Sequence, residues 1–131
     1  MITITSSCTS NADVPVVLQV AGRLDSQASV ELLGSVQKLI AAEKHEIIMD
    51  FQQLDAVSSE GLAALVQSKR RLRKINGALR IANVHGPILE VFELVHFDRV
   101  FDVHPNIEEA FEQFAINRQR TDQPDDARSD P

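Results

Sequence analysis

The sequence predicts an α/β fold in which a single mixed, mostly parallel sheet of about five strands packs against four helices. After the first 20 residues, short apolar runs alternate with amphipathic helical stretches, which is the pattern of units that build parallel strands. The run from Glu46 to Phe51 is nearly all apolar, as in a central strand covered on both faces. Two runs near the N-terminus are joined by a polar, turn-rich segment and predict an antiparallel hairpin.

The hairpin comes first in the chain. Ile2 to Thr5 alternates apolar and polar β-branched residues, as a half-buried strand does. Val16 to Ala21 is the second predicted strand, and Gly22 ends it. A helix is expected over residues 28–43, capped by the residue at position 25 or 26. Its apolar side chains share one helical face: Leu32, Leu33, Val36, Leu39 and Ile40.

The second predicted helix covers about residues 60–75 and follows a short polar turn after the strand that ends at Phe51. Its apolar face includes Leu62, Leu65, Val66 and Leu72. Lys69 also falls on that face, so we expect its aliphatic stem to be covered and its ammonium group to reach solvent. Asn76-Gly77 ends the helix, with the glycine expected in the left-handed conformation.

The last third of the chain repeats the strand–helix pattern. A strand is expected over Leu79–Val84, followed by a helix with Pro87 at its first position. A short strand over Val100–Val103 leads to the last helix, in which Asn106 and Glu109 resemble a capping box. After Asn117 the apolar periodicity stops. We therefore expect a domain over residues 1–116 and a disordered acidic tail over residues 117–131.

Composition disfavours several classes of function. The chain has 131 residues, a formal net charge of −6, no Trp and no Tyr, which disfavours general binding to nucleic acid or to an anionic membrane. Cys8 is the single cysteine, so neither an internal disulfide nor a Cys-based metal site is expected. No apolar run approaches the roughly 20 residues of a membrane-spanning helix, and no signal peptide is evident. We expect a cytoplasmic protein without a cofactor.

Ser59 is the leading candidate for a functional residue. It lies where a helix begins, with Ser58 before it and Glu60 and Gly61 after it. Its structural role would be a helix cap, and its functional role would be that of a phosphoacceptor or a partner contact. A phosphoryl group at a helix N-terminus is favoured by the dipole and the free amides. We therefore expect phosphorylation to weaken a complex and to leave the domain folded.

The residues around Ser59 each allow a structural and a functional interpretation. Ser58 is the competing cap, and if it takes that role the hydroxyl of Ser59 is freer to react. Glu60 suits the dipole of the first turn, yet it also places a negative charge close to Ser59. Asp25 follows a strand that should end at the same sheet edge, where it either caps the first helix or acts as a polar neighbour of Ser59.

An enzyme is not expected. Val57 replaces the first glycine of the G-x-S-x-G elbow found in serine hydrolases. The histidines have no spacing that marks a triad or a metal site, and they stand at positions 45, 85, 96 and 104. The basic run from Lys69 to Lys74 has two interpretations. It is either a solvated helix end or a docking patch for an acidic partner.

At these residues the chain resembles the STAS domain, and within that family the anti-sigma factor antagonists, over about residues 2–115. The motifs that carry the resemblance occur in this order: Gly22-Arg23-Leu24-Asp25, Ile47-Ile48-Met49-Asp50-Phe51, Val57-Ser58-Ser59-Glu60-Gly61-Leu62, Asn76-Gly77-Ala78-Leu79 and Asn83-Val84. The resemblance implies a STAS-like sheet with four helices. It also implies partner switching, in which the unphosphorylated protein binds an anti-sigma factor that is a serine kinase and so frees a sigma factor.

The resemblance further implies that this kinase phosphorylates the serine at the start of the long helix and that a serine phosphatase resets it. By motif position that serine is Ser59, and Asp25 matches the family aspartate near it. The common family pattern has Asp before the serine pair, whereas this chain has Ser58 there and Glu60 in place of the second hydroxyl residue. The alternative is therefore a non-phosphorylated STAS scaffold, or an accessory subunit of a multi-protein or lipid-transport complex.

Overall fold

The computed structural model describes residues 2–7 and 15–119. Among these residues one six-stranded sheet is formed, with the order β1-β2-β3-β5-β6 and β4 paired to β2. The strands are β1 (Ile2–Ser7), β2 (Val16–Leu24), β3 (Glu46–Asp50), β4 (Leu54–Val57), β5 (Ala78–Ala82) and β6 (Asp102–His104). β1 is antiparallel to β2, and every other pair is parallel. The predicted hairpin and mixed sheet are therefore confirmed.

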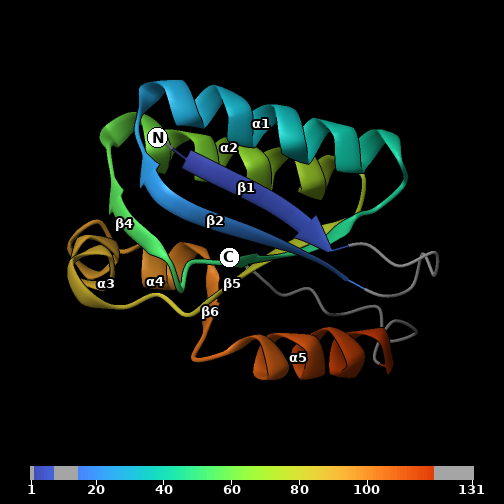
Figure 1. The fold of residues 1–131 in the computed structure, drawn as a ribbon. Helices are drawn as coiled ribbons and strands as arrows, with labels where there is room; N and C mark the ends of the chain where they lie inside the picture. The colour runs from blue at the N-terminus through green and yellow to red at the C-terminus, as the bar shows by residue number, and fades with distance from the viewer. Residues whose placement is uncertain (1, 8–14, 120–131) are drawn as a thin grey trace.

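Helices cover both faces of the sheet (Figure 1). They are α1 (Ser26–Ala41), α2 (Ser59–Lys74), α3 (Gly86–Leu94), α4 (Phe97–Val100) and α5 (Ile107–Gln119). α1 and α2 lie together on one face, and α5 lies on the other, where it contacts β3, β5 and β6. The large core is built between the sheet and α1–α4, whereas α5 closes a small cluster of Ile48, Ala82, Ala110 and Phe114.

This arrangement confirms the prediction that β3 is covered on both faces. Ile47 and Met49 point into the large core, and Ile48 between them points into the small cluster under α5. All three side chains are fully buried. Because side chains alternate along a strand, an all-apolar strand needs a helix layer on each side, and the protein supplies both.

Two elements differ from the sequence-based expectation. The segment Leu54–Val57, expected as a polar turn, is strand β4 and pairs with the end of β2. The strand expected over Val100–Val103 begins two residues later, as β6, because helix α4 occupies Phe97–Val100. α4 forms where Phe101 turns into the core against Phe92 and Phe97. Aromatic packing thus selects a helical turn in a segment whose apolar pattern also suits a strand.

The end of α2 also differs in detail. The left-handed residue is Asn76 (φ 61°), not Gly77. Gly77 is needed for a different reason, because a Cβ there would collide with the carbonyl oxygen of His45. At the other predicted cap, the Asn106 side chain accepts a hydrogen bond from the Glu109 N–H at 2.9 Å, as expected. α5 continues to Gln119, and the tail expected beyond the domain lies, from residue 120, outside the described residues.

Arg80 on β5 is a buried cation beneath α5. Its guanidinium group stands 5.0 Å from the centroid of the Phe114 ring. Its Nη1 lies 3.1 Å from His104 Nε2 and 3.6 Å from the carboxylate of Asp102. Burial lowers the pKa of His104, and the Arg80 charge lowers it further, against the opposing effect of Asp102 and Glu109. The native state therefore favours the neutral imidazole.

This environment predicts a pH dependence of stability. Since the His104 pKa is lower in the folded state than its ordinary 6.5, its contribution is present above about pH 6.5 and is lost as the pH falls through the native pKa. We expect His104→Gln to reduce the loss of unfolding free energy between pH 7 and pH 5, measured by urea denaturation. The control is His85→Gln at an exposed position. A His104→Gln profile identical to that of wild type would contradict the prediction.

Candidate functional site

The serine turn joins the end of β4 to the start of α2. Ser58 is the N-cap residue, and its Oγ accepts a hydrogen bond from the Gly61 N–H at 3.1 Å. The same hydroxyl lies 3.2 Å from the carbonyl oxygen of Leu24 and donates to it. That oxygen also accepts the backbone N–H of Ser58 at 2.9 Å. The hydroxyl of Ser58 therefore has both a donor and an acceptor role in holding α2 against β2.

Ser59 is the first residue of α2 and is exposed. Its hydroxyl forms no hydrogen bond with the residues that the structure describes. Glu60 is also exposed and lies in the first helical turn. The sequence left open which serine caps the helix. The geometry shows that Ser58 is the cap and that Ser59 is exposed.

Gly61 explains why the helix can start so close to β2. It is buried, and a Cβ at this position would lie 2.5 Å from the carbonyl oxygen of Leu24 and 2.8 Å from Val57 Cγ2. The first of these atoms belongs to the backbone and cannot rotate away. Gly61 is therefore a packing requirement of the turn that presents Ser59.

Asp25 occupies the equivalent position at the start of α1. Its Oδ1 accepts a hydrogen bond from the Ala28 N–H at 2.9 Å, so Asp25 is the N-cap of that helix. Leu24 and Val57 are paired across the parallel strands β2 and β4, so the residues that follow them emerge side by side. Asp25 and Ser58 accordingly line one depression of about 200 Å³, which confirms that the two helix starts share a sheet edge.

The same depression includes a residue that sequence reasoning did not select. Arg23 lines it together with Leu24, Ala56 and Val57, and its side chain is exposed. The signal that could have found it is the unrecognised strand β4, because pairing of β4 with β2 brings Arg23 opposite Ala56. The depression thus carries one cation and one carboxylate beside the cap of α2.

The basic run of α2 is divided between two environments. Lys69 is half-buried, and its Nζ donates to the carbonyl oxygen of Val100 while standing 5.3 Å from the centroid of the Phe101 ring. The contact with the Phe101 ring confirms that Lys69 lies on the apolar side of α2. Its ammonium group is hydrogen-bonded there to the backbone of Val100. Arg70, Arg73 and Lys74 are exposed.

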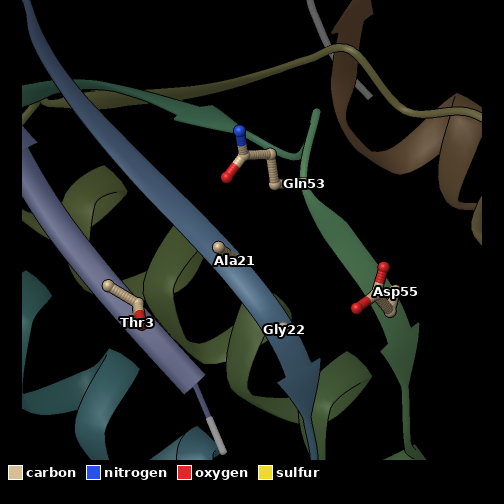
Figure 2. A pocket seen from close by; sticks show the side chains of 5 residues that line it. All are labelled: Thr3, Ala21, Gly22, Gln53 and Asp55. Carbon is tan, nitrogen blue, oxygen red and sulfur yellow. The ribbon is translucent and has the colours of Figure 1, made fainter.

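A second depression lies along β1, β2 and β4. Figure 2 shows its lining by Thr3 of β1, Ala21 and Gly22 of β2, Asp55 of β4 and Gln53 just before β4. Its volume is about 500 Å³. Neither depression is lined by a histidine or a cysteine. Within the described ranges no cluster of three metal-ligating side chains occurs, and no helix there is long and apolar enough to cross a membrane.

Comparison with known proteins gives a consistent picture. The family model of the STAS domain matches residues 6–110. BtrV of Bordetella bronchiseptica, by name an anti-sigma factor antagonist, is 30% identical over 88 residues, which cover 67% of this chain and 72% of BtrV.

Solved structures of other proteins share the fold, and three of them, from two proteins, are compared with it in turn. An anti-sigma factor antagonist from Mycobacterium paratuberculosis has a TM-score of 0.75 at 20% identity, covering 88% of this chain and 95% of that one. The Bacillus cell fate determinant SpoIIAA, solved in its phosphorylated form, has a TM-score of 0.64 at 20% identity, covering 90% of this chain and 100% of that one. SpoIIAA is also known in an unphosphorylated form of similar fold, with a TM-score of 0.62 and 19% identity, covering 90% and 98% of the two chains.

Proposed function

Because the chain belongs to the STAS domain family, we propose that it is an anti-sigma factor antagonist that acts in the cytoplasm by partner switching. One observation carries the proposal: Ser59 is exposed at the start of α2 and its hydroxyl has no hydrogen bond to a described residue, while the hydroxyl of Ser58 is held by Leu24 and Gly61. The name of BtrV and the two forms of SpoIIAA support it by analogy.

In this proposal the unphosphorylated protein binds an anti-sigma factor that is also a serine kinase, and the sigma factor is released. The kinase then uses ATP. The Ser59 oxygen attacks the γ-phosphorus, the bond from that phosphorus to the bridging oxygen of ADP breaks, and the hydroxyl proton passes to a base of the kinase. A serine phosphatase later hydrolyses the phosphoester. The protein supplies only the acceptor and the docking surface and catalyses no step itself.

The position of Ser59 makes the switch compatible with a stable fold. Phosphorylation adds roughly −1.5 to −2 charges at pH 7. At the first turn of α2 these charges meet the positive end of the helix dipole and amides that lack intrahelical partners. The charge therefore acts on the complex, because a hydrated phosphoryl group is costly to bury in a protein contact.

A second candidate function is a non-phosphorylated scaffold or an accessory subunit of a lipid-transport complex. The observation that favours it is the chemistry around Ser59, where Ser58 stands in place of the family aspartate and the exposed carboxylate of Glu60 is adjacent. This carboxylate disfavours a second negative charge nearby. Stable co-purification with an ABC-type ATPase, in place of a kinase, would favour this function.

The test of the proposed function is mass spectrometry after incubation with ATP and each serine-kinase anti-sigma factor encoded in the same genome. We expect one phosphate on the wild-type peptide that covers residues 50–70. Ser58→Ala should keep the phosphate and Ser59→Ala should lose it, which separates the two adjacent hydroxyls. An unmodified Ser59 with every such kinase would contradict the proposal.

A further inference from the structure

Three exposed apolar side chains lie on the short segment of α3 and α4, Leu94 and Val95 at the end of α3 and Val100 at the end of α4. Leu94 is 78% exposed, Val95 41% and Val100 42%. Of the large apolar side chains that the structure describes as exposed, only Val30 on α1 lies elsewhere. Single exposed apolar residues are ordinary, but a group of them on one surface marks an interaction site.

This group is joined to α2. The Lys69 ammonium group donates to the carbonyl oxygen of Val100 and stands over the Phe101 ring. The side chain of Lys69 on α2 therefore reaches the end of α4. Val100 itself is 42% exposed.

The same face of α2 leads to the candidate phosphoacceptor. Positions 59, 62, 66, 69 and 73 follow the i, i+3, i+4 spacing of one helical stripe. Leu62 and Val66 on this stripe are half-buried, and Ser59 is exposed. With a rise of about 1.5 Å per residue, Ser59 and Lys69 are roughly 15 Å apart along the helix. A standard protein contact buries about 800 Å² on each partner and readily covers that span.

We infer that these residues form one docking surface, the α2–α4 seam, made of Leu62, Val66, Leu94, Val95 and Val100, and that its occupant is the anti-sigma factor. The inference rests on the proposed function and adds to it where the partner is held. Ser59 lies at one end of the seam and the α3–α4 turn at the other. Binding is thus anchored by apolar contacts at a distance from the residue that is modified.

Charge indicates what the partner must present. The chain carries a net charge of −6, but the exposed charges on the last turns of α2 are cationic: Arg70, Arg73 and Lys74. None of these three forms an ion pair with another described residue. The partner surface is therefore apolar where it meets Leu94 and Val100 and carries carboxylates where it meets the cations of α2.

The test is isothermal titration calorimetry of the anti-sigma factor that phosphorylates Ser59 against unphosphorylated variants. Leu94→Asp and Val100→Asp place a carboxylate in the seam. Each should weaken binding at least tenfold with an unchanged urea midpoint, since both side chains are exposed. Val30→Asp is the control, because Val30 is 71% exposed but lies on α1, and it should bind as wild type does.

Failures of the two proposals are distinguishable. If wild type binds and the seam variants bind equally well, or if Val30→Asp weakens binding as much as they do, the seam is wrong and the proposed function stands. If the wild-type protein binds no anti-sigma factor, the proposed function and the seam are both overturned.

Discussion

Ser59→Asp is expected to weaken binding of the anti-sigma factor by roughly 10- to 100-fold, or about 1.4–2.8 kcal/mol. The exposed hydroxyl at the start of α2 would become a carboxylate within the contact, where an unpaired charge is costly to desolvate. Titration calorimetry with the purified anti-sigma factor measures the change. The fold should be unaffected, because a carboxylate in the first turn suits the helix dipole.

Ser59→Ala is the matched variant. This substitution removes a hydroxyl that has no hydrogen bond to the described residues. The variant should therefore bind the anti-sigma factor about as tightly as wild type does, and the kinase should not phosphorylate it with ATP. If Ser59→Asp and Ser59→Ala bound equally well, charge at this position would not control the complex, and partner switching through Ser59 would be refuted.

The second large effect is on stability. Gly61→Ala should lower the unfolding free energy by about 1–3 kcal/mol, as overpacking of a close contact does. The new Cβ would lie 2.5 Å from the carbonyl oxygen of Leu24, and that oxygen also anchors Ser58. α2 would have to move away from β2, so we also expect slower phosphorylation of Ser59. Urea denaturation measures the first effect and an ATP-dependent kinase assay the second.

The control is Gly34→Ala in α1. A Cβ at Gly34 meets no atom within 4 Å, and alanine is the better helix former by about 0.5–1 kcal/mol. This variant should therefore be more stable than wild type, with unchanged phosphorylation. If Gly34→Ala and Gly61→Ala lowered the unfolding free energy equally, the close contact with Leu24 would not explain the effect at Gly61.

The sheet was predictable because its signals are local. Period-2 alternation in β1 and β2, the all-apolar run of β3 and the helical stripes between strands all follow from neighbouring residues. β4 was missed for the opposite reason. Leu54 is buried while Asp55 is exposed, which is too short a pattern to predict a strand, and the segment becomes one only because β2 continues past a register shift at Gly22 and Arg23 to pair with it.

The sequence predicted which residues gather at the serine turn, but it did not predict the role that each of them takes. Two adjacent serines before a glycine and an apolar helical pattern indicated a helix start, and either hydroxyl suits a cap. The choice of Ser58 depends on the carbonyl oxygen of Leu24, which is 34 residues away in the chain. Arg23 was missed for the same reason, because it reaches the depression beside Ser58 only through the pairing of β2 with β4.

The most direct measurement of whether charge on Ser59 controls binding compares two preparations of one protein in titration calorimetry with its anti-sigma factor. One preparation is unphosphorylated, and the other carries a single phosphate on Ser59, verified by mass spectrometry. We predict at least about tenfold lower affinity for the phosphorylated form, with the same circular dichroism spectrum and urea midpoint. Equal affinities, or a phosphorylated protein that has lost its fold, would contradict the account.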